Sequence, residues 1–309
     1  MSLDKKITFP KNLKEFGYGF DEGGKLRKVD LVTNVMSKEE GFEFNVSEDP
    51  QYNQKRYEAL GEVINEYVYD LLEKEGLRRI PVPKTSNAPL ALRSSIFASE
   101  DAFENEKLLI LIHGSGVVRA GQWARRLIIN DDLNSGTQLP YIRRGRKLGY
   151  GILVLNTNDN SRTIGNEVKK IPGSEDPYAH LRTVWSDYVK GSNAKKIGII
   201  AHSYGGVCTI KFAMENPEEF VKKVFAVAFT DSVHSSMMPT KGTDHIIKIT
   251  KNWVTSDKPL DTPEKTSSDD VECVSAGTSV HEMTSWSSIE SVFRFLEQRY
   301  RSVTAKEEL

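Results

Sequence analysis

Residues 197–212 read IGIIAHSYGGVCTIKF and join an apolar run to an apolar-periodic segment through a serine and two glycines. The apolar run predicts a strand buried on both faces, and the periodicity after the serine predicts a helix. A tight turn of this kind needs small residues two positions before and two positions after the serine, and Ala201 and Gly205 fill those positions. The pattern therefore predicts a nucleophile elbow, with Ser203 as nucleophile facing a helix N-terminus that favours developing negative charge.

A second motif lies earlier in the chain, where residues 108–118 read LLILIHGSGVV. A strand that ends in His-Gly-Ser-Gly matches a loop whose backbone N–H groups form an oxyanion hole. One such donor contributes about 2.7–4 kcal/mol to stabilising the transition state of acyl transfer. We expect the donors to be the N–H of Tyr204 and an N–H of Ser115 or Gly116, with His113 shaping the loop.

A serine hydroxyl becomes a good nucleophile only when a base takes its proton. In a chain with these two motifs the base is a histidine that follows both the serine and an acid. His281, in VSAGTSVHEMTSW, lies between a predicted last strand and a predicted final helix and is the favoured base. His234, interpreted as a surface residue, and His245, in a polar segment, are the alternatives. His202 is interpreted as a packed residue of the elbow.

The acid has three candidates. Asp231 directly ends the predicted strand VFAVAFTD, so its carboxylate is expected at the carboxyl edge of the sheet, where ligand-facing groups of parallel sheets lie. There it would fix the tautomer of His281 and stabilise the imidazolium. Asp257 and Asp261 stay open as alternatives if a further strand runs through 246–254. Separately, Asp231 could serve only to cap a turn.

Outside these motifs, short apolar strands alternate with amphipathic helices. The predicted strands are 80–82, 95–98, 108–112, 152–155, 197–200, 224–229 and 271–274, and the predicted helices are 52–75, 138–147, 178–190, 204–215 and 287–299. Such alternation predicts a mostly parallel central sheet with helices on both faces. With the elbow and the glycine loop, the sequence predicts an α/β protein of the α/β-hydrolase fold.

The composition of the chain suggests three parts. Residues 1–50 are predicted to be an extension with a small hairpin that packs on the core, residues 51–300 the hydrolase-like domain, and residues 301–309 a charged tail. Within the domain, 156–177 and 232–270 are polar and are interpreted as surface loops that carry lid and pocket residues.

Charge and motif content narrow the function classes. The 309 residues carry a net charge of -1, so no overall basic excess indicates direct nucleic-acid binding. A local cluster of Arg119, Arg125, Arg126 and the basic residues of 143–147 is interpreted as the solvated faces of two helices. The sequence contains no zinc-type ligand cluster, no Walker loop and no dinucleotide-binding glycine motif, so neither a metal nor a cofactor is expected.

Several features bear on the compartment. Cys208 and Cys273 lie far apart in apolar surroundings, which favours a reducing compartment over a disulfide framework. The start of the sequence lacks the apolar run of a signal peptide, and no segment reaches the roughly 18–20 apolar residues of a membrane helix. The final KEEL resembles an endoplasmic-reticulum retrieval signal, so an endoplasmic-reticulum pool stays open beside an ordinary charged tail.

Five blocks of the sequence resemble the Arb-two (Argonaute-binding protein two) domain family, and in particular its animal cotranscriptional-regulator branch. The blocks are NQKRYEALGEVINEYVYDLLEK, LIHGSGVVRAGQWARRLIINDDLNSGTQLPYI, AHSYGG, TDSVH and VSAGTSVHEMTSW, within residues 10–300. The resemblance implies an α/β-hydrolase-like domain whose nucleophile, by analogy, is Ser203. It also implies a protein of the nucleus and cytoplasm that binds Argonaute and chromatin-remodelling proteins and influences alternative splicing.

The chain departs from its relatives at 156–177, which is a short loop where they carry a long lysine-rich insertion. If the insertion carries nuclear targeting or a partner site, those functions are in question for this chain. Three hypotheses follow: a serine hydrolase acting on a small ester, thioester or amide, an inactive scaffold for protein partners, and an RNA-binding protein. Net charge near zero makes the third the weakest. Since a pure scaffold has no need of every polar triad member, we expect a hydrolase-competent site inside a regulatory protein.

Overall fold

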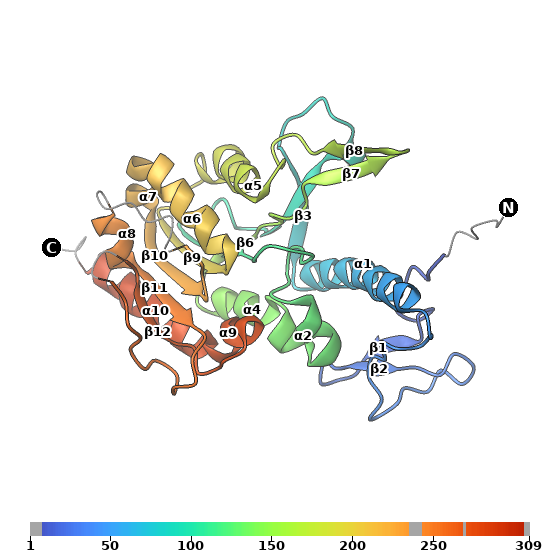
Figure 1. Cartoon of the computed structure of the whole chain (residues 1–309). Coiled ribbons are helices and arrows are strands. Elements are labelled where there is room, and N and C mark those ends of the chain that lie inside the picture. The colour runs from blue at the N-terminus through green and yellow to red at the C-terminus, as the bar shows by residue number, and fades with distance from the viewer. Residues whose placement is uncertain (1–7, 235–242, 268–269, 306–309) are drawn as a thin grey trace.

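The computed structural model describes residues 8–234, 243–267 and 270–305, and an eight-stranded sheet forms its centre (Figure 1). In spatial order the strands are β3 (Leu77–Val82), β4 (Ser94–Ser99), β6 (Gly151–Val154), β5 (Lys107–Ile112), β9 (Lys196–His202), β10 (Val224–Thr230), β11 (Thr250–Val254) and β12 (Glu272–Ser275). Strand β4 runs antiparallel to β3 and β6, and the other neighbours are parallel. Numbered along the chain, this order is 1-2-4-3-5-6-7-8, the topology of the α/β-hydrolase fold. The predicted fold class is confirmed.

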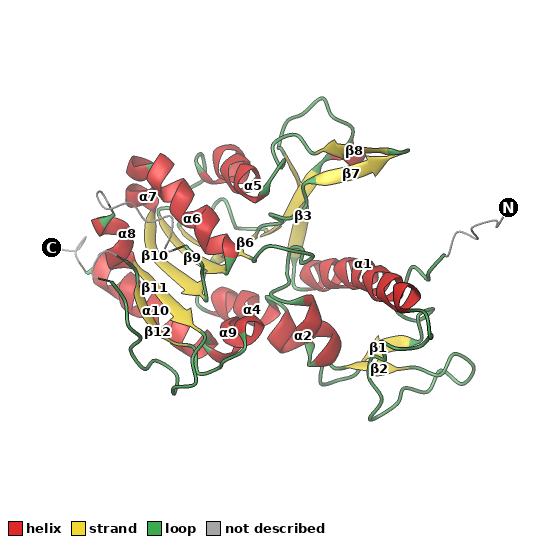
Figure 2. Cartoon of the chain, viewed as in Figure 1, coloured by secondary structure: helices red, strands yellow, loops and turns green. Residues whose placement is uncertain are grey.

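Helices cover both faces of the sheet (Figure 2). One face is covered by α1 (Pro50–Lys74), α4 (Leu139–Lys147) and α10 (Ile289–Thr304), and the other by α5 (Pro177–Val184), α6 (Tyr204–Glu215), α7 (Pro217–Lys223) and α8 (Asp244–Ile249). The shorter elements are α2 (Arg125–Asn130), α3 (Leu133–Gly136), α9 (Thr284–Ser287), the π-helical turn η2 (Trp185–Val189) and the 3-10 turns η1 (Leu90–Leu92) and η4 (His281–Met283).

Alternate residues of each strand supply the two halves of the core. Leu109 and Leu111 of β5 pack with α1, α4 and α10, whereas Leu108, Ile110 and Ile112 pack with α5, α6 and α8. Successive side chains of a strand point to opposite faces, and here both faces are buried. This double burial explains why the run LLILI contains no polar residue.

The long helix α1 starts at a well-defined cap. The carboxylate of Asp49 accepts a hydrogen bond from the N–H of Gln51 at 2.9 Å, and Pro50 occupies the first helical turn, where its missing N–H is not needed. Leu60 and Ile64 of its buried face are completely inaccessible to solvent. The predicted helix at 52–75 is confirmed.

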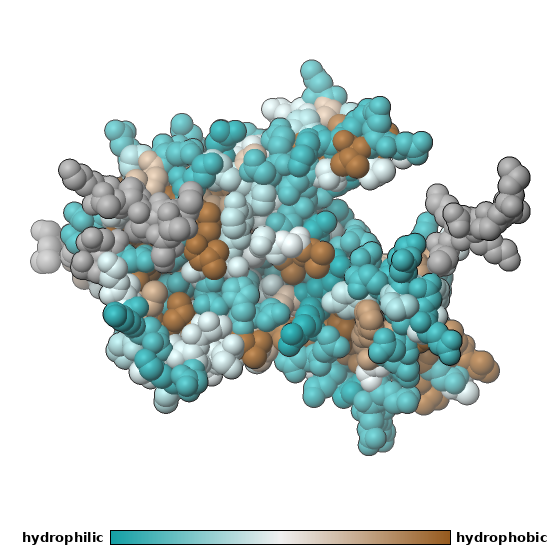
Figure 3. All heavy atoms as spheres, in the orientation of Figure 1, coloured by the Kyte–Doolittle hydropathy of each residue, from teal (hydrophilic) through white to brown (hydrophobic). Residues whose placement is uncertain are grey.

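The N-terminal segment forms a small hairpin of β1 (Tyr18–Phe20) and β2 (Leu26–Lys28), paired antiparallel. The ring of Phe20 stacks on Tyr67 of α1, with 4.9 Å between ring centroids, and so ties the hairpin to the helix. Apolar side chains lie on the surface of this region (Figure 3), among them Val32, which is 89% exposed. The hairpin therefore packs on α1, while apolar residues of the loop that follows it lie on the surface.

Two segments interpreted as surface loops contain regular structure, so both interpretations were wrong in part. Segment 156–177 carries a second hairpin of β7 (Ser161–Ile164) and β8 (Glu167–Lys170), which projects from the body at the upper right of Figure 1. Segment 232–270 carries α8 and β11, the strand that the pattern left open. Because β11 inserts between β10 and β12, the sheet is one strand wider than the apolar runs indicated.

The division into an extension (1–50), a hydrolase-like domain (51–300) and a charged tail (301–309) stays a prediction. The KEEL sequence lies outside the described residues. Among the helices of the described residues, none is long and apolar enough to cross a membrane.

Candidate active site

The elbow is a strained turn between β9 and α6. Ser203 has φ 50° and ψ -118°, a conformation that residues with a side chain rarely adopt. Its N–H donates a hydrogen bond to the carbonyl of Thr230 at 3.1 Å, which anchors the turn to β10. The hydroxyl therefore stands at the carboxyl edge of the sheet, and the side chain is half-buried.

The small residues on either side of the serine are required by close approach. A Cβ atom at Gly205 would lie 2.8 Å from the carbonyl oxygen of His113 and 2.9 Å from that of Ile112, closer than side chains pack. Ala201 is completely buried. Two crossing backbones thus leave no room for a larger residue, which is the steric condition that the sequence predicted for an elbow.

The glycine loop after β5 lies directly against the elbow. A Cβ atom at Gly114 would lie 3.1 Å from Cβ of Ser203, and Gly116 has a left-handed φ of 101°. The His113 ring is buried and its Nδ1 donates to the carbonyl of Gly114 at 2.8 Å, while burial lowers the pKa of His113 to about 4. A neutral histidine that bonds its own loop fits the predicted role in shaping it. Ser115 and Gly116 both line the cavity in front of Ser203.

Tyr204, the other predicted oxyanion donor, is the first residue of α6. Its side chain is 39% exposed and lines a neighbouring cavity with Tyr178 and Val233 rather than the cavity in front of Ser203. The predicted contribution of Tyr204 is its backbone N–H, which does not depend on where the ring points.

The structure brings His281 and Asp231 together. Nδ1 of His281, at the start of η4, lies 2.6 Å from Oδ2 of Asp231, which directly follows β10. The second carboxylate oxygen accepts the N–H of Thr255 at 3.0 Å, and the N–H of Asp231 donates to the carbonyl of Trp253 at 2.7 Å. The carboxylate is thus held by β11 and its following loop and faces the imidazole.

The two partners shift each other's pKa in opposite directions. The hydrogen bond from Asp231 raises the pKa of His281 above its ordinary value, although partial burial opposes the rise. Burial works to raise the pKa of Asp231, but the hydrogen bonds from His281 and Thr255 outweigh it and lower this pKa. Asp231 is therefore ionised at neutral pH, and an imidazolium at His281 is stabilised by it.

Ser203 and His281 line one cavity of about 490 Å³, together with Gly114, Ser115 and Gly116. Within the described residues, no hydrogen bond joins the Ser203 hydroxyl to His281. The His281 ring lies 4.7 Å from the ring of His202, which is buried and bonded to Thr230, as expected for a packed elbow residue. Such hydrogen bonds between nucleophile and base are often absent without substrate and form in the reacting complex.

The rival acids lie elsewhere. Asp257 is exposed. Asp261 accepts hydrogen bonds from Trp253 Nε1 at 3.0 Å and from Arg294 at 2.9 Å, so it ties the sheet to α10. The geometry therefore pairs His281 with Asp231 and with neither alternative.

The rival bases are also separate from Ser203. His234 is completely buried, with its Nδ1 2.8 Å from Ser232 Oγ and its Nε2 3.3 Å from Asp270, so its interpretation as a surface residue was wrong. It follows β10 closely, and its ring packs against Phe229 of that strand, with 4.8 Å between ring centroids. His245 lies on α8, and its buried Nε2 finds no hydrogen-bond partner in residues 8–234, 243–267 and 270–305.

The basic cluster is not uniformly solvated, and Arg125 contradicts that interpretation. Its side chain is only 4% exposed and lines the Ser203 cavity, whereas the side chain of Arg126 next to it is 65% exposed. Arg119 donates to the carbonyls of Val117 and Val118 at 3.3 and 3.2 Å. Nothing in the local sequence distinguishes a buried arginine from its exposed neighbour, so sequence reasoning missed this residue.

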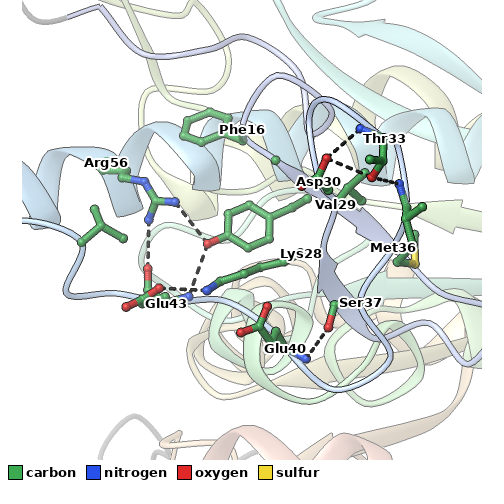
Figure 4. A pocket seen from close by; sticks show the side chains of 14 residues that line it. Phe16, Lys28, Val29, Asp30, Thr33, Met36, Ser37, Glu40, Glu43 and Arg56 are labelled. Atoms are coloured by element: carbon green, nitrogen blue, oxygen red, sulfur yellow. Dashed lines mark hydrogen bonds and ion pairs between the residues drawn. The ribbon is translucent and has the colours of Figure 1, made fainter.

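A second cavity, of about 560 Å³, lies in the N-terminal hairpin region (Figure 4). Its polar groups bind one another: Lys28 pairs with Glu43 at 2.9 Å, and Arg56 donates to the Tyr18 hydroxyl at 3.1 Å and to the Glu43 carbonyl at 2.9 Å. Asp30 accepts hydrogen bonds from its own turn. We call it the N-terminal cavity.

Within residues 8–234, 243–267 and 270–305, no group of three His, Cys, Asp or Glu side chains could hold a metal ion. Both cysteines are free, Cys208 buried and Cys273 half-buried. The side chains at the Ser203 cavity with groups suited to acyl transfer are a serine and an imidazole, and a carboxylate bonds the imidazole.

Several known proteins resemble this chain in sequence over most of its length. Residues 9–260 match the model of the Arb2 domain. The chain is 39% identical to the cotranscriptional regulator ARB2A of Homo sapiens, over 97% of this chain and 83% of the relative, and 40% identical to the ARB2A homolog of Gallus gallus, over 94% and 81%. A solved structure of the histone deacetylase Clr3 covers 78% of this chain and 39% of its own, at a TM-score of 0.48 and 14% identity.

Proposed function

This chain belongs to the Arb2 domain family, as its sequence predicted, and we propose that it is a cotranscriptional regulator whose hydrolase-fold domain retains a serine-hydrolase site. Its substrate class is a small ester, thioester or amide. The proposal joins two lines of support, the names of the relatives and the side chains around Ser203.

In this mechanism Ser203 is the nucleophile, His281 the base and Asp231 the orienting acid. The Ser203 hydroxyl attacks the substrate carbonyl while its proton passes to Nε2 of His281, and the same proton then protonates the leaving group. Backbone N–H groups of Tyr204 and of Ser115 or Gly116 stabilise the oxyanion. Water, activated by His281, releases the acyl group from the serine.

The observation that carries the proposal is the contact of 2.6 Å between His281 and Asp231 at the cavity that contains Ser203. These residues are far apart in the sequence, and two of the three have left-handed backbones, Ser203 at φ 50° and Asp231 at φ 52°. Strained residues cost of order 1–3 kcal/mol each and are concentrated at functional sites. Packing alone gives no reason for a strained serine and a strained aspartate at one edge.

The regulatory half of the proposal rests on resemblance. Relatives at about 40% identity are named cotranscriptional regulators. We further propose, from the family resemblance of the sequence, that the chain binds Argonaute and chromatin-remodelling proteins and influences alternative splicing in the nucleus and cytoplasm, with an endoplasmic-reticulum pool left open. Direct RNA binding has little support, because Arg125 is buried and Arg119 is bonded to backbone carbonyls.

A second candidate function is an inactive scaffold for Argonaute and chromatin proteins. Two observations favour it: no hydrogen bond joins Ser203 to His281 within the described residues, and the N-terminal region exposes apolar side chains such as Leu31 and Val32. Exposed apolar residues that are clustered are typical of protein-binding surfaces.

Labelling with a fluorophosphonate probe separates the two functions. The probe reacts with an activated serine, so the full chain should be labelled and Ser203→Ala should not be. A matched control is Ser192→Ala, at a serine just before the start of β9. Its hydroxyl donates a hydrogen bond to the carbonyl of Val189, and the variant should keep full labelling. If the folded wild-type protein stays unlabelled while small neutral molecules are shown to enter the cavity, the scaffold is the function.

A further inference from the structure

Arg125 forms part of the wall of the Ser203 cavity with hydrogen-bonding capacity left unused. Its guanidinium packs on helix α1 at Gly61, where a Cβ atom would lie only 2.2 Å from Nη1. Nη2 donates to the carbonyl of Val117 at 3.1 Å and lies 3.5 Å from Oε1 of Glu62. The Nε–H group is buried and has no hydrogen-bond partner among the described residues. An arginine side chain has five N–H donors, and within the described residues only those of Nη2 make hydrogen bonds here.

The charge of Arg125 is poorly compensated. Its acidic neighbour Glu62 has a side chain that is 70% exposed, so water screens the attraction across 3.5 Å. Burial lowers the pKa of Arg125, and Glu62 only partly offsets this. Buried charges in proteins are normally paired, so a weakly paired guanidinium at a cavity wall favours the binding of an anion.

A second cation stands at the rim of the same cavity. Arg126 follows in the chain, and its guanidinium lies 4.0 Å from Glu282, the residue after His281. This distance is the outer limit of an ion pair, and the Arg126 side chain is 65% exposed. An anion that enters the cavity therefore passes one weakly paired guanidinium and reaches another.

We propose that the substrate of this site carries a carboxylate, which binds between Arg125 and Arg126 while its ester or thioester carbonyl faces Ser203. The half-ester of a short dicarboxylic acid is the simplest molecule of this class. A planar guanidinium matches a carboxylate through two parallel hydrogen bonds, which is why arginine recognises this group. The inference rests on the proposed hydrolase function, and it adds the charge of the substrate.

The test compares two ligands of the same shape with the full-length Ser203→Ala protein, which cannot turn them over. Titration calorimetry is run with monomethyl glutarate, which is anionic, and with the methyl ester of glutaramic acid, its neutral amide. The anion should bind at least about tenfold more tightly, since hydrogen bonds to charged groups are the stronger ones. Arg125→Met and Arg126→Gln should each remove this preference.

Arg143→Gln is the matched control, because Arg143 is an exposed arginine of α4 that pairs with Glu75 away from the cavity. It should keep the preference for the anion. Arg126 is exposed, so its substitution keeps the test decisive even if Arg125→Met does not fold. Equal binding of the two ligands, no binding of either at millimolar concentration, or a preference that survives Arg126→Gln would each overturn the proposal and leave Arg125 as a residue that only positions the loop at Val117.

Fluorophosphonate labelling of the wild type separates this outcome from that of the proposed function. Labelling of Ser203 without a preference for the anion overturns the carboxylate site alone. A preference for the anion without labelling overturns the hydrolase and keeps an anion-binding cavity.

Discussion

The Ser203 cavity and the N-terminal cavity are similar in size and opposite in chemistry. In the N-terminal cavity of about 560 Å³, Lys28, Glu43 and Arg56 bind one another. In the Ser203 cavity of about 490 Å³, the Ser203 hydroxyl makes no hydrogen bond to His281, and Arg125 Nε has no partner within the part of the chain that the structure describes. The charged groups of the N-terminal cavity thus hold one another, whereas the Ser203 cavity keeps a serine hydroxyl that is not bonded to its base and an arginine that is only partly bonded.

The two cavities therefore differ in how far their polar groups are bonded to other parts of the protein. Polar groups that satisfy one another contribute to stability and leave little for a ligand, whereas strained or unpartnered groups cost stability and are retained where function needs them. Substitutions at the Ser203 cavity should therefore change reactivity more than stability, and substitutions at the N-terminal cavity should do the reverse.

The largest effect is expected for Asp231→Asn. Loss of the carboxylate leaves His281 in the wrong tautomer and its imidazolium unstabilised, so the rate of fluorophosphonate labelling should fall on the order of 10⁴-fold. Asp257→Asn, at an exposed aspartate, should label like the wild type. Equal labelling of Asp231→Asn and wild type would show that the contact of 2.6 Å has no part in activating Ser203.

Gly205→Ala should have the next largest effect. The new Cβ would meet two backbone carbonyl oxygens at 2.8 and 2.9 Å, and overpacking of this kind costs about 1–3 kcal/mol of unfolding free energy. Chemical denaturation measures the loss, and labelling should slow because the elbow must open. Gly191→Ala is the control, since no atom of the described residues outside its chain neighbours lies within 4 Å of the position that its new Cβ would occupy. A Gly205→Ala protein as stable as Gly191→Ala would contradict the crossing-backbone account.

A smaller effect concerns pH. The base must be neutral to take a proton, and Asp231 raises the pKa of His281. The labelling rate of the wild type should therefore rise with pH and reach half its maximum above about pH 6.5, the ordinary histidine value. In Asp231→Asn the half-maximal point should move to lower pH. A rate that stays constant from mildly acidic to mildly basic pH would remove His281 from the reaction.

The smallest effect belongs to the N-terminal cavity. Tyr18→Phe removes the hydroxyl that accepts hydrogen bonds from Arg56 at 3.1 Å and from the N–H of Glu43 at 3.4 Å, which should lower the unfolding free energy by about 0.5–1.5 kcal/mol. Labelling at Ser203 should not change. Tyr52→Phe, whose hydroxyl makes no hydrogen bond within the described residues, is the control. A slower labelling rate in Tyr18→Phe would show that the N-terminal cavity does influence the reactivity of Ser203.

The parts of the site that follow from local rules could be predicted from sequence. The elbow depends on the size of Ala201 and Gly205 and on a strand and a helix next to Ser203, all of which are read within residues 197–212. Helix 204–215 occupies the predicted residues. Steric constraints between neighbours leave a pattern in the sequence itself.

Features that depend on distant contacts could not be predicted. Strand β11 reads TKNWV, a mostly polar run, and its buried Asn252 bonds Ser232 across the sheet. Without that strand, the choice between Asp231 and the later aspartates stayed open. The burial of Arg125 likewise depends on the absence of a side chain at Gly61, on a helix far earlier in the chain.

The left-handed backbone at Ser203 also determines which residue would give the most stable fold at this position. Glycine adopts φ 50° freely, so a Ser203→Gly exchange would relax the turn and stabilise the folded chain. Drift in a chain that served only as a scaffold would therefore run toward glycine. A serine at this position therefore costs the folded chain free energy that a glycine would not cost.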